Sequence, residues 1–234
     1  MTVIDPAAPL AEVVLAAPAS VPLLEALRLD YCCHGERTLD EACAARGFDA
    51  PTLAAVLVAL DEAGCDGRPD HHDVSRASIE ELCEHLVVAH HGPLRTSLAR
   101  IDHLLATVVR VHRGEHPELE DLQRLVTGLH AELDRHMADE EQVLFPACRA
   151  LERQGGGTLG DEAIAALEHD HDDVGRTLVA IRELAGGYRT ERAFCGTHRM
   201  LLEALRRLTA ELHQHIHEEN NVLFPRVRAL ANAG

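Results

Sequence analysis

Residues 136–146 read HMADEEQVLFP, and residues 215–225 read HIHEENNVLFP. Each stretch contains a His-x-x-x-Glu unit and then, after two intervening residues, VLFP, and the two copies lie 79 residues apart. Residues four apart on an α-helix lie about one turn apart on the same face. The imidazole and the carboxylate of each unit can therefore point at one metal ion. The repeat predicts two helices that each contribute one His and one Glu to a shared site.

Apolar residues on both sides of each unit recur in steps of three and four, the pattern of a helix face that is buried in a bundle. A carboxylate buried among aliphatic side chains is unfavourable unless a cation compensates its charge. The pattern therefore favours a metal ion in the core. The predicted buried faces are Val126, Leu129, Leu133, His136, Glu140 and Val143 in one helix, and Leu205, Leu208, Leu212, His215, Glu219 and Val222 in the other.

Two further helices, over about 78–112 and about 160–185, carry one buried-face histidine each, namely His91 and His171. The neighbouring His90 and His169 fall outside these faces, and His213 and His217 beside the second repeat are expected on the surface. The turn near residue 114 lies midway between residues 91 and 136, so antiparallel helices bring those two histidines to one level. The second hairpin is less regular, because its glycine pair at 186–187 lies well short of the midpoint.

The predicted fold class is all-α: an antiparallel four-helix bundle over residues 78–232, preceded by a small helical N-terminal domain over residues 1–70. Capping boxes, Thr38 with Glu41 and Ser78 with Glu81, mark two helix starts. The polar segment 65–77, CDGRPDHHDVSRA, is expected to be an interdomain linker. Pro146 and Pro225 are expected either to loosen the helical turn beside them or to end the helix.

Composition excludes several classes of function. Acidic residues outnumber basic ones by 39 to 22, giving a formal charge of −17, which disfavours binding to nucleic acid or to anionic lipid. All basic residues are Arg, so Schiff-base chemistry and a P-loop lysine are excluded. The longest uninterrupted apolar run is 53–60, far below the length of a membrane span, and the N-terminus lacks the basic residues of a secretory signal. The chain is instead rich in metal-ligating residues, with 17 His.

The predicted metal ligands are four histidines and two glutamates at one level of the bundle. This nitrogen and oxygen donor set suits two divalent ions, each bound by two imidazoles and both bridged by the two carboxylates. Iron is the first expectation, and manganese or zinc are the expected substitutes. Coordination positions remain for an oxo or hydroxo bridge and an external small ligand. The set is His91, His136, Glu140, His171, His215 and Glu219.

Seven cysteines without a regular framework fit a reducing cytoplasm better than a disulfide scaffold. Cys32 and Cys33 are adjacent, a spacing that rarely closes a disulfide without strain. Two interpretations stay open for this pair. In the first, the cysteines form a reactive thiolate pair that hands over iron, meets a cluster or senses oxidation. In the second, they simply pack at a helix end. The others, Cys43, Cys65, Cys83, Cys148 and Cys195, are expected to be packing or incidental residues.

The chain resembles hemerythrin-like domains, and more closely the di-iron proteins that repair iron–sulfur clusters, the repair-of-iron-centres family. The bundle carries HHGPLR at 90–95 and HDDVG at 171–175 besides the two repeats, and the segment 29–43 resembles that family's N-terminal domain with its vicinal cysteine pair followed by Gly35. The resemblance places the family's iron ligands on the six residues named above. Hemerythrins proper use an additional His and an Asp, so the final His-x-x-x-Glu unit favours repair over oxygen storage.

The resemblance implies a cytoplasmic stress protein that restores iron–sulfur clusters damaged by nitric oxide or oxidants, with a non-haem di-iron centre that donates iron, or binds and reduces NO. It implies damaged iron–sulfur proteins as partners and NO or O₂ as small ligands. Whether the protein is an enzyme stays open, as does a homodimeric state. The alternatives are a hemerythrin-type carrier or sensor of O₂ or NO without repair activity, and a helical interaction protein that binds no metal.

Overall fold

The computed structural model describes residues 3–63, 74, 76–157 and 161–232. The chain divides into two compact units, one formed by residues 1–77 with residues 216–225 and the other by residues 78–215 with residues 226–234. The last helical run thus contributes residues to both units. Among the described residues no β-strand forms, and helices account for nearly all of the regular structure, which confirms the predicted all-α class.

The N-terminal part contains short helices whose starts are fixed by side-chain caps. Thr38 accepts a hydrogen bond from the backbone N–H of Glu41, whose carboxylate accepts one from the N–H of Thr38, so the expected capping box is present. Arg28 adopts a left-handed conformation with φ 58°, which ends its helix at Leu27. The first helix was not foreseen from the sequence. The elements are α1 (Leu10–Ala16), a 3₁₀ turn (Pro18–Ser20), α2 (Val21–Leu27), α3 (Leu39–Arg46) and α4 (Ala50–Glu62).

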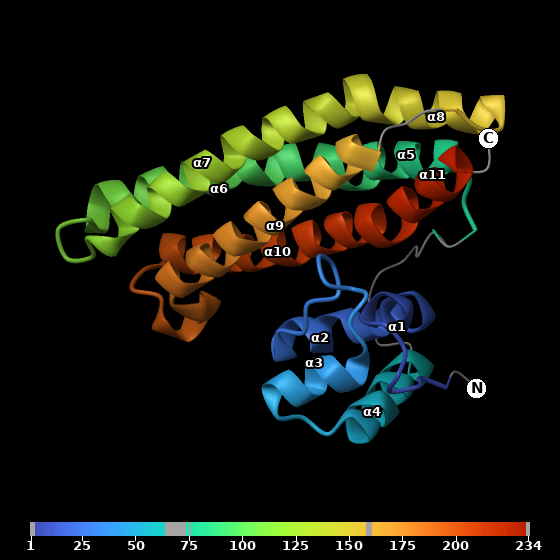
Figure 1. Cartoon of the computed structure of the whole chain (residues 1–234). Coiled ribbons are helices and arrows are strands. Elements are labelled where there is room, and N and C mark those ends of the chain that lie inside the picture. The colour runs from blue at the N-terminus through green and yellow to red at the C-terminus, as the bar shows by residue number, and fades with distance from the viewer. Residues whose placement is uncertain (1–2, 64–73, 75, 158–160, 233–234) are drawn as a thin grey trace. The chain divides into compact units, whose positions relative to one another are not determined.

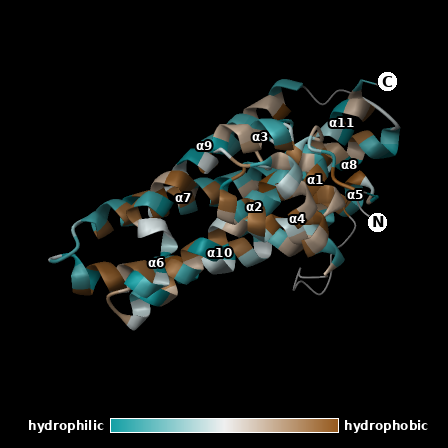
Figure 2. Ribbon diagram, turned by 90° about the horizontal axis from the view of Figure 1, so that it is seen from below, coloured by the Kyte–Doolittle hydropathy of each residue, from teal (hydrophilic) through white to brown (hydrophobic). Residues whose placement is uncertain are grey.

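The second unit contains long antiparallel helical runs, seen as the rods of Figure 1 that carry the labels α6, α7, α9 and α10. In Figure 2, apolar and polar stretches alternate along these helices, as amphipathic bundle helices require. Three of the runs are interrupted by a π-helical turn. The runs are α5 (Ile79–His85), η2 (Leu86–His91) and α6 (Gly92–His112); α7 (Glu118–Asp139), η3 (Glu140–Leu144) and α8 (Phe145–Gln154); α9 (Asp161–Leu184); and α10 (Gly196–Glu218), η6 (Glu219–Leu223) and α11 (Phe224–Ala231).

Each π-turn ends two residues before a proline. The prolines are Pro93, Pro146 and Pro225, and each helix continues past its proline instead of ending there. Proline has no N–H and clashes with the carbonyl four residues earlier, so the ordinary α-helical bonding pattern is disturbed at this point. A π-turn inserts one extra residue, which loosens the helix just where the proline requires it. Of the two outcomes expected for Pro146 and Pro225, loosening is therefore the one observed.

A later start of its second helix removes part of the irregularity of the second hairpin. From His171, α9 runs 13 residues to its end, whereas 19 residues separate the start of α10 from His215. Two 3₁₀ turns, Gly186–Tyr188 and Thr190–Arg192, fill the connection, and positive φ angles at Gly187 and Tyr188 break the helix. The predicted start near residue 190 was therefore wrong by about one and a half turns.

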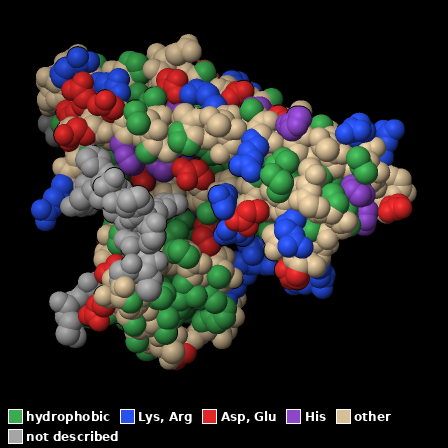
Figure 3. Space-filling model, turned by 180° about the vertical axis from the view of Figure 1, so that it is seen from behind, with side chains coloured by type: hydrophobic (Ala, Val, Ile, Leu, Met, Phe, Trp, Pro, Cys, Tyr) green, Lys and Arg blue, Asp and Glu red, His purple; other side chains and the backbone are tan. Residues whose placement is uncertain are grey.

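The predicted linker, 65–77, falls mostly outside the described residues, as does Cys65. The predicted domain limits stay a prediction. In the part of the chain that is described, no single helix is long and apolar enough to cross a membrane. Figure 3 shows acidic and basic side chains mixed over the face in view, with no broad basic field on that face.

Candidate metal centre

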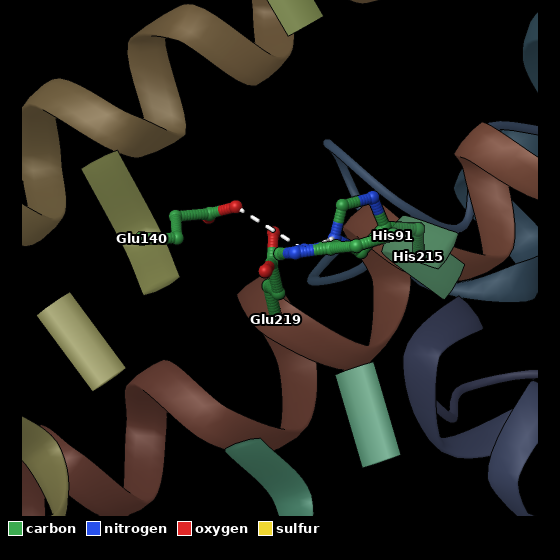
Figure 4. A group of neighbouring side chains, drawn as sticks. All are labelled: His91, Glu140, His215 and Glu219. Carbon is green, nitrogen blue, oxygen red and sulfur yellow. Dashed lines mark hydrogen bonds and ion pairs between the residues drawn. The ribbon is translucent and has the colours of Figure 1, made fainter. Parts of the chain in front are cut away.

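The six predicted ligands come together in two groups that share both glutamates. In each group, one potential ligand atom per residue lies within 4.8 Å of all the others. All six residues are buried. Figure 4 shows Glu140 reaching toward His91 and His215 with Glu219 between them. One group is His91, Glu140, His215 and Glu219, and the other is His136, Glu140, His171 and Glu219.

The Glu140 carboxylate divides its two oxygens between the two histidine pairs. Its Oε1 lies 3.1 Å from His136 Nε2, and its Oε2 lies 3.4 Å from His91 Nε2. Within each pair, the Nε2 atoms face each other, at 3.2 Å for His91 and His215 and at 3.1 Å for His136 and His171. Each oxygen of Glu140 thus faces a different histidine pair.

These separations fit ligands around an ion. With metal–ligand bonds of about 2.1 Å, two ligands at a right angle lie about 3.0 Å apart, and two at a tetrahedral angle about 3.4 Å apart. The observed distances of 3.1, 3.2 and 3.4 Å fall in this interval. Imidazole nitrogens and carboxylate oxygens are the donors that iron, manganese and zinc accept. The residues present therefore fit a dinuclear metal centre, although ligation by each residue stays a prediction.

A second layer of polar side chains fixes the orientation of His91. Its Nδ1 lies 2.8 Å from Glu141 Oε1, and that oxygen also accepts a hydrogen bond from Arg95 at 2.9 Å. Burial raises the pKa of Glu141, but the hydrogen bonds from Arg95 and His91 outweigh burial and leave this pKa below its ordinary value. The carboxylate therefore stays ionised and can hold the imidazole with its Nε2 toward the centre.

The π-turns change which neighbours of the ligands are buried. Val143, expected on the buried face, is 68% exposed, and Leu144 is buried in its place. The extra residue in η3 rotates everything after Glu140 by about one position, which an unbroken α-helical pattern does not anticipate. His90, expected outside the buried face, is buried for the same reason, because it lies within η2.

His217 was expected on the surface, but it is fully buried and contacts the segment between α2 and α3. Its Nδ1 lies 3.2 Å from the carbonyl oxygen of Tyr31, and the two rings meet edge to face. Asn221 donates hydrogen bonds to the carbonyls of Tyr31 and Cys32. Gly35 approaches so closely that a Cβ added there would lie 2.6 Å from Asn221 Oδ1, which explains why this position needs glycine.

Cys32 and Cys33 are free thiols whose sulfurs are 3.8 Å apart. The Cys32 thiol donates to Asp30 Oδ1 at 3.4 Å, and the same oxygen accepts the backbone N–H groups of both cysteines. The Cys33 sulfur, burial and the Asp30 carboxylate together raise the pKa of Cys32 well above the usual value of a thiol. The raised pKa favours the protonated form of Cys32, and both interpretations of the cysteine pair stay predictions.

Known proteins share both parts of this arrangement. Residues 83–227 match the hemerythrin HHE cation binding domain, and residues 7–61 match the ScdA_N domain, described as a domain of unknown function (DUF542). The iron-sulfur cluster repair proteins YtfE of Citrobacter koseri, Escherichia coli O1:K1 and Escherichia fergusonii are each 33% identical over 221 residues, which cover 94% of this chain and 96% of theirs. The chain belongs to the YtfE family.

Membership of the YtfE family confirms the resemblance predicted from the sequence. The hemerythrin domain includes all six predicted ligands, since its match begins before His91 and ends after Glu219. Together with the buried His and Glu groups, the domain indicates a di-iron site.

Proposed function

We propose that this protein restores iron–sulfur clusters damaged by nitric oxide or oxidants, with a non-haem di-iron centre held by four histidines and two bridging glutamates. The observation that carries the proposal is the pair of buried groups that share Glu140 and Glu219. The relatives that cover nearly the whole chain are named iron-sulfur cluster repair proteins, which supports the same function. Manganese or zinc would substitute for iron in the same donor set.

When bound, iron supplies reversible one-electron chemistry and open coordination positions for NO or O₂. Residues of the chain favour metal binding at this position. Glu140 and Glu219 provide two negative charges in a buried region, which favour positively charged ions there. Glu141 and Arg95 hold His91 in position, and Phe145 lies against the same ring at a centroid distance of 5.7 Å, excluding water from that side.

Two routes to repair follow from this arrangement. In the first, an iron ion leaves the protein as cargo and enters a damaged cluster of a client protein. In the second, two NO molecules would be bound and reduced to N₂O and water, with the two electrons supplied by bound ferrous iron and the two protons by solvent. Both routes need the shared glutamates, but only iron donation lowers the metal content of the protein as the client recovers.

The test is reactivation of an enzyme whose [4Fe–4S] cluster has been damaged by NO. Full-length protein loaded with iron is added anaerobically, and client activity, client iron and donor iron are measured together. We expect reactivation by the wild type and by His169→Gln, an exposed histidine outside the groups. We expect none by Glu219→Gln. Reactivation that is equal in Glu219→Gln and the wild type would contradict a role of the centre.

The same assay separates repair from the carrier or sensor alternative. A carrier binds NO or O₂ reversibly but leaves the client inactive, and its behaviour does not depend on Cys32 and Cys33. We expect the double variant Cys32→Ser/Cys33→Ser to keep its iron and to reactivate the client more slowly. No reactivation by the wild type, together with reversible ligand binding, would favour the carrier.

A further inference from the structure

A second cluster of metal-ligating side chains lies outside the six residues of the di-iron centre. His85, His90 and Glu218 each offer one ligand atom, and these atoms lie within 4.8 Å of one another. His90 and Glu218 are each only 5% exposed, and His85 is half-buried. The cluster therefore differs from a group of solvated surface charges, because most of it is removed from water.

The π-turn η2 explains how the two histidines meet. Residues five apart point about 140° away from each other on an α-helix, since each residue turns the helix by about 100°. In a π-helix the repeating bond joins residues five apart, so His85 and His90 return to one face. Their ring centroids are 5.4 Å apart. The local backbone thus creates a pair of imidazoles that the sequence pattern does not reveal.

A carboxylate fixes the His90 ring from its other side. His90 Nδ1 lies 2.7 Å from Glu211 Oε1. Glu211 precedes Glu218 by seven residues, or about two turns, so both carboxylates lie on one face of α10. A carboxylate on one nitrogen of an imidazole is the usual support of a metal-binding histidine.

We propose that His85, His90 and Glu218 bind a third, mononuclear divalent cation, with Glu211 positioning His90. Two imidazoles and one carboxylate suit Fe²⁺, Zn²⁺ or Co²⁺. Three protein ligands leave positions for water, so the ion exchanges more readily than ions held between two bridging glutamates. No ligand is shared with the di-iron centre, but the His90 ring stacks on that of His215 at 5.4 Å.

This position next to the di-iron centre suits an exchangeable ion that is held for delivery or reloading. That use rests on the proposed repair function, whereas the binding site itself does not. The two ideas can therefore fail separately: a protein that binds the third ion but restores no cluster retains the site and loses only the delivery role.

The test uses full-length protein with its di-iron centre loaded, titrated anaerobically with Co²⁺ alone. Equilibrium dialysis and elemental analysis give cobalt and iron per chain, and the visible spectrum of Co²⁺ reports its ligands. We expect one cobalt per chain beyond the two irons. Glu218→Gln and His85→Gln should each weaken cobalt binding at least tenfold while both irons remain. His169→Gln, which changes an exposed histidine 3.8 Å from Asp173, should bind cobalt like the wild type.

Three results would overturn the site. The wild type could bind no cobalt beyond the two irons, or both variants could bind it as tightly as the wild type. Alternatively, the variants could lose iron while cobalt binding stays unchanged, which would show that these residues support the di-iron centre instead. Circular dichroism and iron content verify the fold of each variant, and the use of two variants protects the test against failure of one to fold.

Discussion

The substitution Glu140→Gln should change the stability of the protein in opposite directions with and without metal. Glu140 and Glu219 are both fully buried, and their ligand atoms lie within 4.8 Å of each other. Two unit charges at 4.8 Å repel by about 3.5 kcal/mol at an effective dielectric constant of about 20. In the metal-free protein this repulsion opposes folding, and glutamine removes it without changing the volume of the side chain.

The neighbouring imidazoles offset part of the repulsion, so we expect metal-free Glu140→Gln to be more stable than the metal-free wild type by about 1–3 kcal/mol. For a chain of this size, each kcal/mol shifts Tm by about 2–4 °C. The expected rise in Tm is therefore about 2–12 °C. A gain in stability is unusual, because most substitutions of fully buried residues lower stability.

With metal present, the same substitution should lower stability. Glutamine carries no charge and offers one carbonyl oxygen, so it cannot bridge the two histidine pairs that Glu140 faces at 3.1 and 3.4 Å. We expect the metal content to fall from two ions per chain to one or none. A 100-fold loss of affinity removes about 2.7 kcal/mol of stabilisation by bound metal.

The assay is thermal unfolding of both proteins under anaerobic conditions, with bound iron and after its removal by a chelator, alongside elemental analysis. The matched control is Glu203→Gln, the same change on a half-buried residue of α10 that pairs with Arg206 and Arg207. Surface pairs of this kind contribute less than about 1 kcal/mol, so its Tm should hardly move in either state. Two irons per chain in Glu140→Gln, or a lower Tm of its metal-free form, would refute the reasoning.

Three other predictions concern the surroundings of the centre and of the cysteine pair. Arg95→Ala removes a partner of Glu141, so the iron affinity, measured by chelator competition, should fall by about tenfold while both iron sites remain. An unchanged affinity would mean that Glu141 needs no support from Arg95. Asp30→Asn removes the charge that helps to raise the pKa of Cys32, so alkylation of this thiol at pH 8 should become several-fold faster, as followed by mass spectrometry. An equal or slower rate would contradict a role of the Asp30 charge in raising this pKa. Gly35→Ala forces its neighbours apart and should lower the free energy of unfolding in urea by about 1–3 kcal/mol, and a neutral effect would show that the close approach is easily relaxed.

The ligand set could be predicted because helical periodicity holds over the residues that carry it. His136 and Glu140 precede their π-turn or begin it, and His215 and Glu219 do the same in the second repeat. The spacing of four therefore stays that of an α-helix within each unit. The extra residue of the π-turn acts only beyond the glutamate, which is why Val143 was misplaced while the predicted His and Glu residues do lie together.

Residues beside the ligands could not be placed, because their burial depends on interactions that a helical pattern does not contain. His217 is buried through the carbonyl of Tyr31, a residue 186 positions away in the sequence. The α1 helix was missed because a short apolar stretch between prolines gives no clear periodic signal. In both cases tertiary packing, and not local preference, decides the outcome.

The HHGP motif and the VLFP repeats show how the burial of residues beside the π-turns could have been predicted correctly from the sequence. All three place a proline two residues after the end of a π-turn, and in all three the helix continues. A proline inside a strongly amphipathic run is thus better treated as the mark of one inserted residue than as a helix end. Applied to the first helix, this rule places Leu86, which is fully buried, on the buried face and brings His85 onto the face of His90. The meeting of the two histidines proposed for the third cation then follows from the position of Pro93, whereas Glu218 is brought to them by α10.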